Sequence, residues 1–183
     1  MKYFLSSIIC ASLLFHSGTI HAEKKFGEVV DSFNGVNVYY NGIFSSSSER
    51  SLSEDGYNIG LKYQCVEFIK RYYLETYDHK MPNTWGHAKD FFDSSIPDGK
   101  VNSARGLFQH VNGGKTSPKV GDIIIFSPTL LNRYGHVAIV SSVTENEIEI
   151  VQQNTPFVGT RESISIQGSR VLNDRILGWL SRS

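Results

Sequence analysis

The chain has few cysteines, no excess of either charge, and no apolar run long enough to cross a bilayer comfortably. Only 2 of its 183 residues are Cys, too few for the disulfide framework of a small secreted domain or for a zinc site without histidines. Lys and Arg number 18, as do Asp and Glu, which argues against a nucleic-acid partner or an anionic membrane surface. With 40% hydrophobic residues, the chain suits one globular domain with a sizeable core.

Metal and cofactor motifs are also missing. His79, His87 and His110 lack zinc-ligand spacing. Residues 54–56 (EDG) resemble a fragment of a calcium loop but lack its alternating acidic ligands. No glycine-rich phosphate loop occurs. We therefore expect neither a bound metal nor a cofactor.

The first 22 residues read as a secretory signal peptide. A basic start at Lys2 precedes the apolar run 4–15 (FLSSIICASLLF), and Ala22 offers a small residue for cleavage. The alternatives are a buried helix or a single membrane anchor, but the run is short for a membrane span. We expect a mature domain over residues 23–183, without a stable membrane anchor, in a bacterial protein that is periplasmic or secreted. Cleavage removes Cys10 and leaves a single thiol, which is an intermolecular link, an inert buried group or a reactive one.

Local patterns predict helices followed by an antiparallel sheet. Alternation around Asn34-Gly35 predicts a hairpin or two short strands within residues 26–40. The Ser-rich stretch 45–55 predicts a loop, residues 64–77 an amphipathic helix, and residues 85–92 a shorter second helix. Strands are predicted at 121–126, 136–143, 147–153 and 175–180. This order predicts an α+β domain with N-terminal helices packed on an antiparallel β-sheet.

Three features of the mature chain together predict nucleophilic catalysis. Cys65 stands at the expected helix start, where the helix dipole and backbone N–H groups favour thiolate and lower the thiol pKa from about 8.5. His136 opens a strand after a glycine, where it can take the thiol proton. Gln152 and Asn154 lie two residues apart, hence on one face of a strand, and either amide oxygen can orient the imidazole.

Each feature has an ordinary structural alternative. A cysteine in a helix can be buried and inert, a strand histidine can be a structural hydrogen-bonding group, and residues 152–154 can begin a turn before Pro156. The residues alone thus leave a cysteine hydrolase and a non-catalytic fold both open.

The motifs resemble those of a known family. Residues 60–68 (GLKYQCVEF), 134–140 (YGHVAIV) and 151–154 (VQQN) are similar to the CHAP family of cysteine- and histidine-dependent amidohydrolases/peptidases. The likeness is strongest to the amidase domain of glutathionylspermidine synthetase/amidase. It extends to residues 26–27, 35–36 and 39 near the start and to residues 176–179 near the end, so it covers nearly the whole mature chain.

The resemblance implies a papain-like α+β fold and amide hydrolysis through an acyl-thioester. It implies Cys65 as the nucleophile, His136 as the base, and Gln64 with the Cys65 amide as contributors to an oxyanion site. Asn154 matches the family pattern. The family often has an acidic residue where this chain has Gln152, and a neutral amide stabilises an imidazolium less than a carboxylate does.

Export and the resemblance together favour peptidoglycan as the substrate. We expect an amidase or endopeptidase that cuts amide bonds in cell-wall peptides. One alternative is an amidase of glutathionylspermidine-like γ-glutamyl or polyamine conjugates. Another, prompted by Gln152, is a catalytically weakened module that binds peptide. The sequence is silent on any inhibitor or immunity partner.

Overall fold

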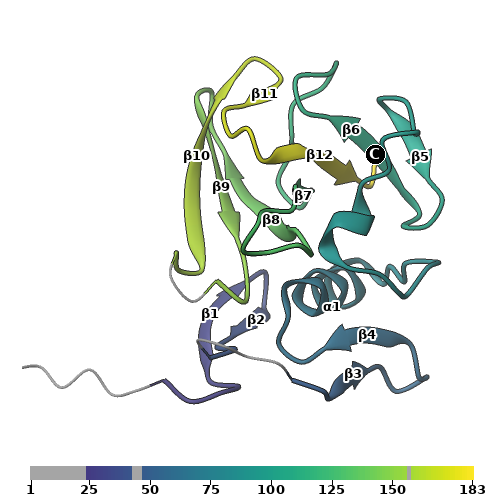
Figure 1. Cartoon of the computed structure of the whole chain (residues 1–183), viewed down its shortest axis with the longest axis vertical. Helices are drawn as coiled ribbons and strands as arrows, with labels where there is room; N and C mark the ends of the chain where they lie inside the picture. The colour runs from purple at the N-terminus through teal and green to yellow at the C-terminus, as the bar shows by residue number, and fades with distance from the viewer. Residues whose placement is uncertain (1–23, 43–46, 156–157) are drawn as a thin grey trace, which may run out of the picture.

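A tight β-hairpin opens the part of the chain that the structure describes. The computed structural model (Figure 1) describes residues 24–42, 47–155 and 158–183, so the predicted signal peptide 1–22 and Cys10 lie outside the described residues. Strands β1 (Val29–Phe33) and β2 (Val36–Tyr39) pair antiparallel around Asn34 and Gly35. Both turn residues have positive φ, 50° and 82°, as a two-residue hairpin turn requires. The predicted hairpin is confirmed.

Eight strands form one antiparallel sheet, in the spatial order β11–β10–β9–β8–β7–β12–β6–β5. Their bounds are β5 (Lys100–Asn102), β6 (Leu107–Val111), β7 (Ile123–Phe126), β8 (His136–Val143), β9 (Glu147–Val151), β10 (Arg161–Gln167), β11 (Arg170–Val171) and β12 (Ile176–Ser181). In Figure 1 the β9–β10 hairpin and the β5–β6 pair lie on opposite sides of β7 and β12.

Both faces of the central strands are buried. Alternate residues such as Ile123 and Ile139 join a cluster with the helix, whereas Ile124 and Ala138 join a second cluster. All the buried residues of the second cluster lie in strands of the large sheet. The sheet therefore encloses that cluster by its own curvature, and the helix covers the first.

Helix α1 (Cys65–Tyr77) begins at the predicted cysteine and buries Phe68, Ile69, Tyr72 and Tyr73. It packs against β8, β2 and the strand β4 (Asn58–Leu61). It ends at Asp78, whose φ of 51° is left-handed and whose N–H donates to the Leu74 carbonyl at 2.9 Å, a common helix stop. No helix in the described residues is long and apolar enough to span a bilayer.

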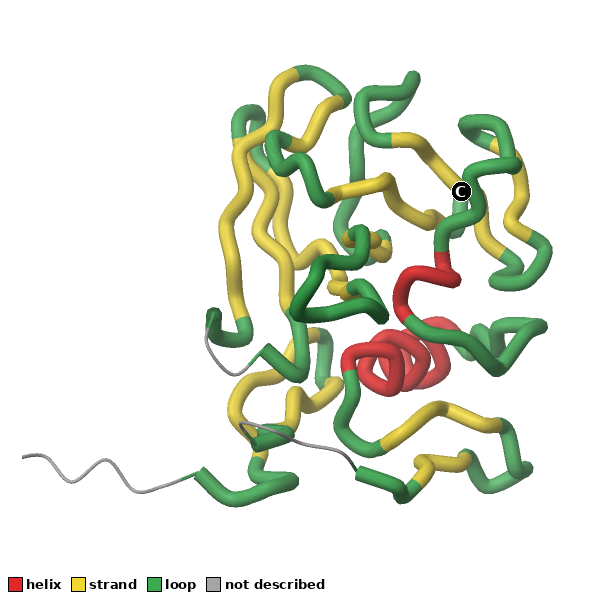
Figure 2. Tube along the Cα trace, viewed as in Figure 1, coloured by secondary structure: helices red, strands yellow, loops and turns green. Residues whose placement is uncertain are grey.

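The structure corrects the expectation of several N-terminal helices. The described residues hold one α-helix, and the helix predicted at 85–92 is a four-residue 3-10 turn, η1 (Ala88–Phe91). The N–H of Lys89, in the first turn of η1, donates to the Tyr134 carbonyl at 2.9 Å. This segment therefore hydrogen-bonds to the loop before β8 and does not extend as a longer helix. Figure 2 shows the two helical segments next to each other, between the large sheet and the β3–β4 hairpin.

The described part of the predicted loop 45–55 also contains a strand. β3 (Arg50–Leu52) pairs with β4, although its serines and charged residues carry little strand signal. Strands β4, β5, β6, β10 and β11 are likewise absent from the sequence prediction. β5, β10 and β11 stand away from the centre of the large sheet and keep exposed positions, so their apolar patterns are weak.

Candidate active site

The helix start places Cys65 beside the strand that carries His136. Cys65 is a free, partly buried thiol at the first residue of α1. The residue before it, Gln64, has extended backbone, with φ −73° and ψ 163°. The backbone N–H of Val137, the residue after His136, favours the thiolate of Cys65. The start of α1 and the start of β8, which are distant in sequence, thus lie together where the helix packs against the strand.

The protonation state of Cys65 differs from the sequence expectation. Burial raises the pKa of the thiol to about 11, and it outweighs the N–H groups of Val137, Val66 and Cys65, which favour thiolate. The expected lowering by the helix N-terminus is therefore wrong for the free protein. The helix N–H groups are present, but removal of the sulfur from water disfavours its anion more strongly.

A glycine allows His136 to open β8 so close to its neighbour strand. Gly135 has φ 74°, and a Cβ there would lie 2.7 Å from the Phe126 carbonyl oxygen. Any other residue would therefore be strained and would push β8 away from β7. The His136 ring packs against Phe126, with ring centroids 5.7 Å apart.

Gln152 orients the His136 ring. The two side chains are joined through Nε2 of His136 and Oε1 of Gln152, 3.0 Å apart. Because an amide oxygen only accepts, Nε2–H donates, and Nδ1 of the neutral ring keeps its lone pair. Burial and, to a smaller extent, nearby Arg175 lower the pKa of His136 to about 4, although the hydrogen bond to Gln152 opposes them. At neutral pH the free site therefore holds an uncharged imidazole and an uncharged thiol.

The spacing of Gln152 and Asn154 predicts that they share one face of a strand, and the structure shows that this prediction is wrong. β9 ends at Val151, and Asn154 has φ 65°, a left-handed conformation that asparagine tolerates. The chain turns, with the Gln152 N–H donating to the Thr160 carbonyl at 2.9 Å. As a result Gln152 reaches His136, whereas Asn154 reaches a different residue.

Asn154 contacts Gln64, the predicted oxyanion residue. Its Nδ2 donates to Oε1 of Gln64 at 2.7 Å. The amide oxygen of Gln64 accepts this bond, and an amide donates hydrogen bonds only through its nitrogen. The structure thus joins four of the five predicted residues in two pairs, Gln152 with His136 and Asn154 with Gln64, and Gln64 directly precedes the fifth, Cys65.

Sequence reasoning missed Gln153. This side chain is buried and its Oε1 accepts from the Tyr39 N–H at 2.8 Å. Its Nε2 donates to the Gln64 carbonyl at 3.1 Å and to Oε2 of Glu67 at 2.9 Å. Gln153 therefore links β2, the residue before Cys65 and helix α1.

A signal for this contact exists in the helix sequence. Glu67 and Arg71 stand four residues apart on a buried face, and Arg71 Nε donates to Glu67 Oε1 at 2.7 Å. A buried ion pair needs further hydrogen bonds to offset its desolvation. A helix with such a pair on its core side therefore predicts a polar residue opposite, and the consecutive amides 152–154 are the candidates.

No group of three or more His, Cys, Asp or Glu side chains that could hold a metal ion occurs in residues 24–42, 47–155 and 158–183. The chemistry of the site lies in one thiol, one imidazole and a set of side-chain amides.

Residues 55–154 match the CHAP domain family. The chain belongs to this family. The matched range contains Gln64, Cys65, His136 and Gln152, and it ends at Asn154. The resemblance inferred from the motifs is confirmed.

Three known proteins are similar to this CHAP domain. Trypanothione synthetase of Crithidia fasciculata is 30% identical over 111 residues, 61% of this chain. Glutathionylspermidine synthase of the same organism is 26% identical over 141 residues, 67% of this chain. Endolysin LysK of Staphylococcus phage K is 30% identical over 116 residues, 63% of this chain. The matches span 17%, 19% and 21% of these proteins, so the chain corresponds to about a fifth of each.

Proposed function

We propose that this CHAP domain is an exported, papain-like cysteine amidase or endopeptidase that hydrolyses amide bonds in peptidoglycan peptides. The observation that carries the proposal is the His136–Gln152 hydrogen bond of 3.0 Å on the strand beside the Cys65 thiol. This bond leaves Nδ1 of His136 as the free base. Similarity to a phage endolysin supports the choice of substrate.

In the proposed reaction His136 acts first as base and then as acid. Nδ1 takes the thiol proton as the Cys65 sulfur attacks the amide carbonyl carbon, and a C–S bond forms. The Cys65 N–H and the Gln64 amide nitrogen stabilise the oxyanion. His136 then protonates the leaving amine as the C–N bond breaks, and water hydrolyses the thioester. Since thiol and imidazole are both neutral in the free site, proton transfer accompanies substrate attack.

Mass spectrometry of digested peptidoglycan tests this function. Wild-type protein should release soluble peptides with new amine ends, and Cys65→Ala should release none. Gln152→Ala should lower turnover by about 100-fold or more, because an unoriented base loses much of general acid–base catalysis. Equal release by wild type and Cys65→Ala would refute the proposal, and unchanged turnover in Gln152→Ala and Asn154→Ala would refute these two roles.

Amidase action on γ-glutamyl or polyamine conjugates is a second candidate. It is favoured by the similarity to trypanothione synthetase and glutathionylspermidine synthase. Parallel assays with purified peptidoglycan and glutathionylspermidine separate the two candidates, since the true substrate should turn over in a Cys65-dependent manner and the other should not.

The neutral site also favours a third candidate, a peptide-binding module with weakened catalysis. A thiol-reactive probe discriminates it. An active enzyme should show Cys65 labelling that slows when His136 is replaced by alanine, whereas an inactive module should show slow labelling that is indifferent to His136.

Export is tested on the protein recovered from cells. If residues 1–22 are a signal peptide, the mature protein from the periplasm or medium should begin at residue 23. Recovery of full-length protein from the cytoplasm alone would contradict it.

A further inference from the structure

A positively charged side chain, Arg175, lies beside His136 at one edge of the large sheet. Phe126, the last residue of β7, pairs with His136 at the start of β8 and with Ile176 at the start of β12, and Figure 1 shows these three strands together. Arg175 directly precedes β12, and its Cζ lies 5.7 Å from the centroid of the Phe126 ring. The His136 ring packs against the same phenyl ring, with centroids 5.7 Å apart.

The Arg175 guanidinium is exposed and has donors to spare. It takes part in none of the ion pairs of the described residues. Within the part of the chain that the structure describes, its side chain makes one long hydrogen bond, from Nη2 to the Ser127 carbonyl at 3.4 Å. A guanidinium carries five N–H donors in a planar fork that matches a carboxylate. The ligand that fits this accessible group is therefore a carboxylate.

The charge of Arg175 opposes the role proposed for His136. It lowers the pKa of the imidazole in the same direction as burial does, although the ring has to become an imidazolium when it takes the thiol proton. Gln152 is neutral and cannot balance this charge. Glu162 lies beyond Gln152, with its Oε2 3.5 Å from Nε2 of that amide. An anion bound to Arg175 would balance the charge directly.

We propose that Arg175 binds a carboxylate of the substrate next to the scissile amide, and that this carboxylate cancels the positive charge beside His136 while the proton is transferred. The proposal rests on the amide hydrolysis proposed above and names the substrate class, peptides with a free carboxylate close to the bond that is cut. Arg175 binds substrate and takes no proton, because the proton passes from Cys65 to His136 and on to the leaving amine.

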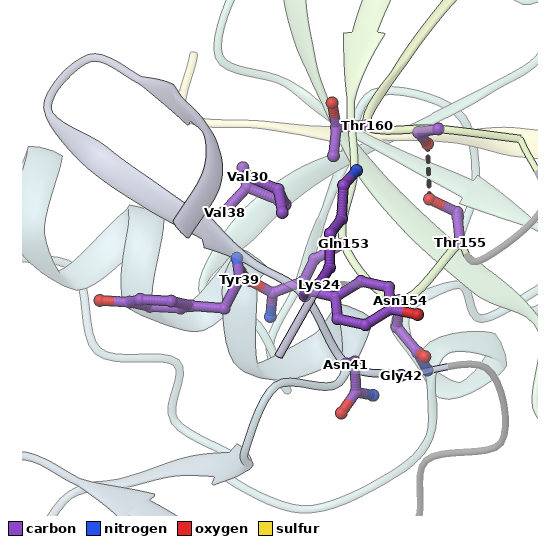
Figure 3. Close-up of a pocket in the computed structure, with 12 residues that line it drawn as sticks. Lys24, Val30, Val38, Tyr39, Asn41, Gly42, Gln153, Asn154, Thr155 and Thr160 are labelled. Carbon is purple, nitrogen blue, oxygen red and sulfur yellow. Dashed lines mark hydrogen bonds between the residues drawn. The ribbon is translucent and has the colours of Figure 1, made fainter. Parts of the chain in front are cut away.

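Lys24 supplies a control cation. It lines a small pocket beside Gln153 and Asn154, between the end of hairpin β1–β2 and the loop after β9 (Figure 3). Neither Cys65 nor His136 lines that pocket, and Lys24 also takes part in none of the ion pairs of the described residues. Lys24→Met therefore removes one positive charge from the chain but not the one beside His136.

Two peptides that differ in one group test the proposal. Both are alanyl-γ-glutamyl-lysine, with the glutamyl α-carboxylate free in one and amidated in the other. Wild type should favour the free acid by about tenfold or more in kcat/KM, as expected for a charge-assisted pair. Arg175→Met should lose this preference, whereas Lys24→Met should keep it. Arg175→Glu should reverse it, which loss of a merely structural side chain would not do.

Several results would overturn the proposal. These are equal kcat/KM values for the two peptides in the wild type, a preference that survives in Arg175→Met, and a preference lost in Lys24→Met instead. Since Arg175 is exposed, its variants should keep the urea midpoint of the wild type. If Arg175→Met fails to fold, Arg175→Lys decides, because it keeps the charge and should keep the preference with a higher KM.

The imidazole NMR signals of His136 give a readout without turnover. In the Cys65→Ala background, Arg175→Met should raise the pKa of His136 by about half a unit, roughly a threefold change in the imidazolium equilibrium. The free-acid peptide should raise this pKa when Arg175 is present and leave it unchanged in Arg175→Met. A His136 pKa that is indifferent to the variant and to the peptide would contradict the role of the carboxylate.

The two proposals fail separately. If the Cys65→Ala protein binds the free acid more tightly than the amide in an Arg175-dependent manner, but the wild type hydrolyses neither, the anion site stands and the amidase does not. If Cys65-dependent hydrolysis shows no preference for the free acid, the amidase stands and the anion site does not. Binding of neither peptide at millimolar concentration would also overturn the anion site.

Discussion

At the scale of single residues, the neutral partner of His136 sets the chemistry of the site. An amide at position 152 orients the ring, but it adds no charge that would favour imidazolium, and burial then holds the His136 pKa near 4. With the pKa of Cys65 at about 11, a resting ion pair is disfavoured. The reactivity of Cys65 in the free protein should therefore rise with pH as the thiol ionises, without the plateau near neutral pH that a resting ion pair would give.

A carboxylate at position 152 should favour the charged form of the His136 ring. In Gln152→Glu the pKa of His136 should rise by at least about one unit, because an adjacent anion favours the imidazolium. Proton transfer from Cys65 to His136 should become about tenfold more favourable for each unit, since each unit is a factor of ten in that equilibrium, and the titration of the imidazole NMR signals measures the rise. Alkylation of Cys65 in the wild type should climb steadily with pH beyond 9.

Glu162 supplies the control for that experiment. Its Oε2 lies 3.5 Å from Nε2 of Gln152, so a glutamate at 152 would face a second carboxylate. The double variant Gln152→Glu/Glu162→Gln relieves this repulsion and should also raise the pKa of His136 by about one unit or more. Imidazole NMR signals that titrate unchanged in both variants would contradict the role of Gln152.

Asp122 should make stability depend on pH. Burial raises its pKa from 3.8 to about 7, against the opposing N–H of Lys119. Between these values the folded protein holds a proton that the unfolded chain has released, so stability falls as pH rises from about 4 to 7 and levels off above. The shift corresponds to at most about 4 kcal/mol.

Replacement of Asp122 by asparagine tests this. Asp122→Asn keeps an acceptor for the Lys119 N–H and cannot ionise. The gap in urea-unfolding free energy between variant and wild type should widen in favour of the variant from pH 4 to 7. A constant gap across that range would show that Asp122 ionises normally.

At the scale of elements, Gln153 joins the loop after β9 to helix α1 and β2. It completes the hydrogen bonding of the buried Glu67–Arg71 pair and holds the Gln64 carbonyl. The start of α1 is therefore positioned by a side chain whose hydrogen bonds join it to Tyr39, Gln64 and the Glu67–Arg71 pair.

Removal of the Gln153 side-chain amide should make the start of α1 less ordered and the whole fold less stable. Gln153→Ala should cost about 2–4 kcal/mol in unfolding free energy, because a buried charged group loses a partner. In protein that is still folded, kcat should fall while the pKa of His136 stays near 4. Asn154→Ala, which leaves Glu67 paired, is the matched control and should cost less stability.

At the scale of the whole molecule, the curved sheet depends on close contact at β12. Gly178 pairs with Val111 of β6 on one side and Ile125 of β7 on the other. A Cβ at this position would overlap the carbonyl oxygen of His110 and lie 2.9 Å from the Phe92 ring. The His110 carbonyl cannot retreat without separating β6 from β12.

Gly178→Ala should therefore destabilise the protein by more than about 3 kcal/mol or prevent its folding, as overpacking at a rigid backbone does. Gly168→Ala is the comparison, because nothing lies within 4 Å of its Cβ and only the positive φ of 58° opposes it. That variant should lose about 1 kcal/mol. Similar urea midpoints for the two variants would contradict the tight packing at β12.

Much of the architecture follows from local sequence. Asn34-Gly35 dictates the hairpin turn, the helix begins at Cys65, and β8 has the predicted bounds 136–143. These elements have strong periodicity or turn chemistry of their own. β3, β5, β10 and β11 do not, because short or half-exposed strands are stabilised by their neighbours more than by their own residues.

The sequence by itself determined which chemical groups this CHAP domain has: one thiol outside the predicted signal peptide, the histidine His136 after a permissive glycine, and three consecutive amides. Only the tertiary structure decided how the amides are used, with Gln152 on His136, Gln153 on Glu67 and Asn154 on Gln64. It also decided that thiol and imidazole rest uncharged. The reason is physical, since pairing and desolvation depend on segments that lie some 90 residues apart along the chain and meet only when the sheet closes over the helix.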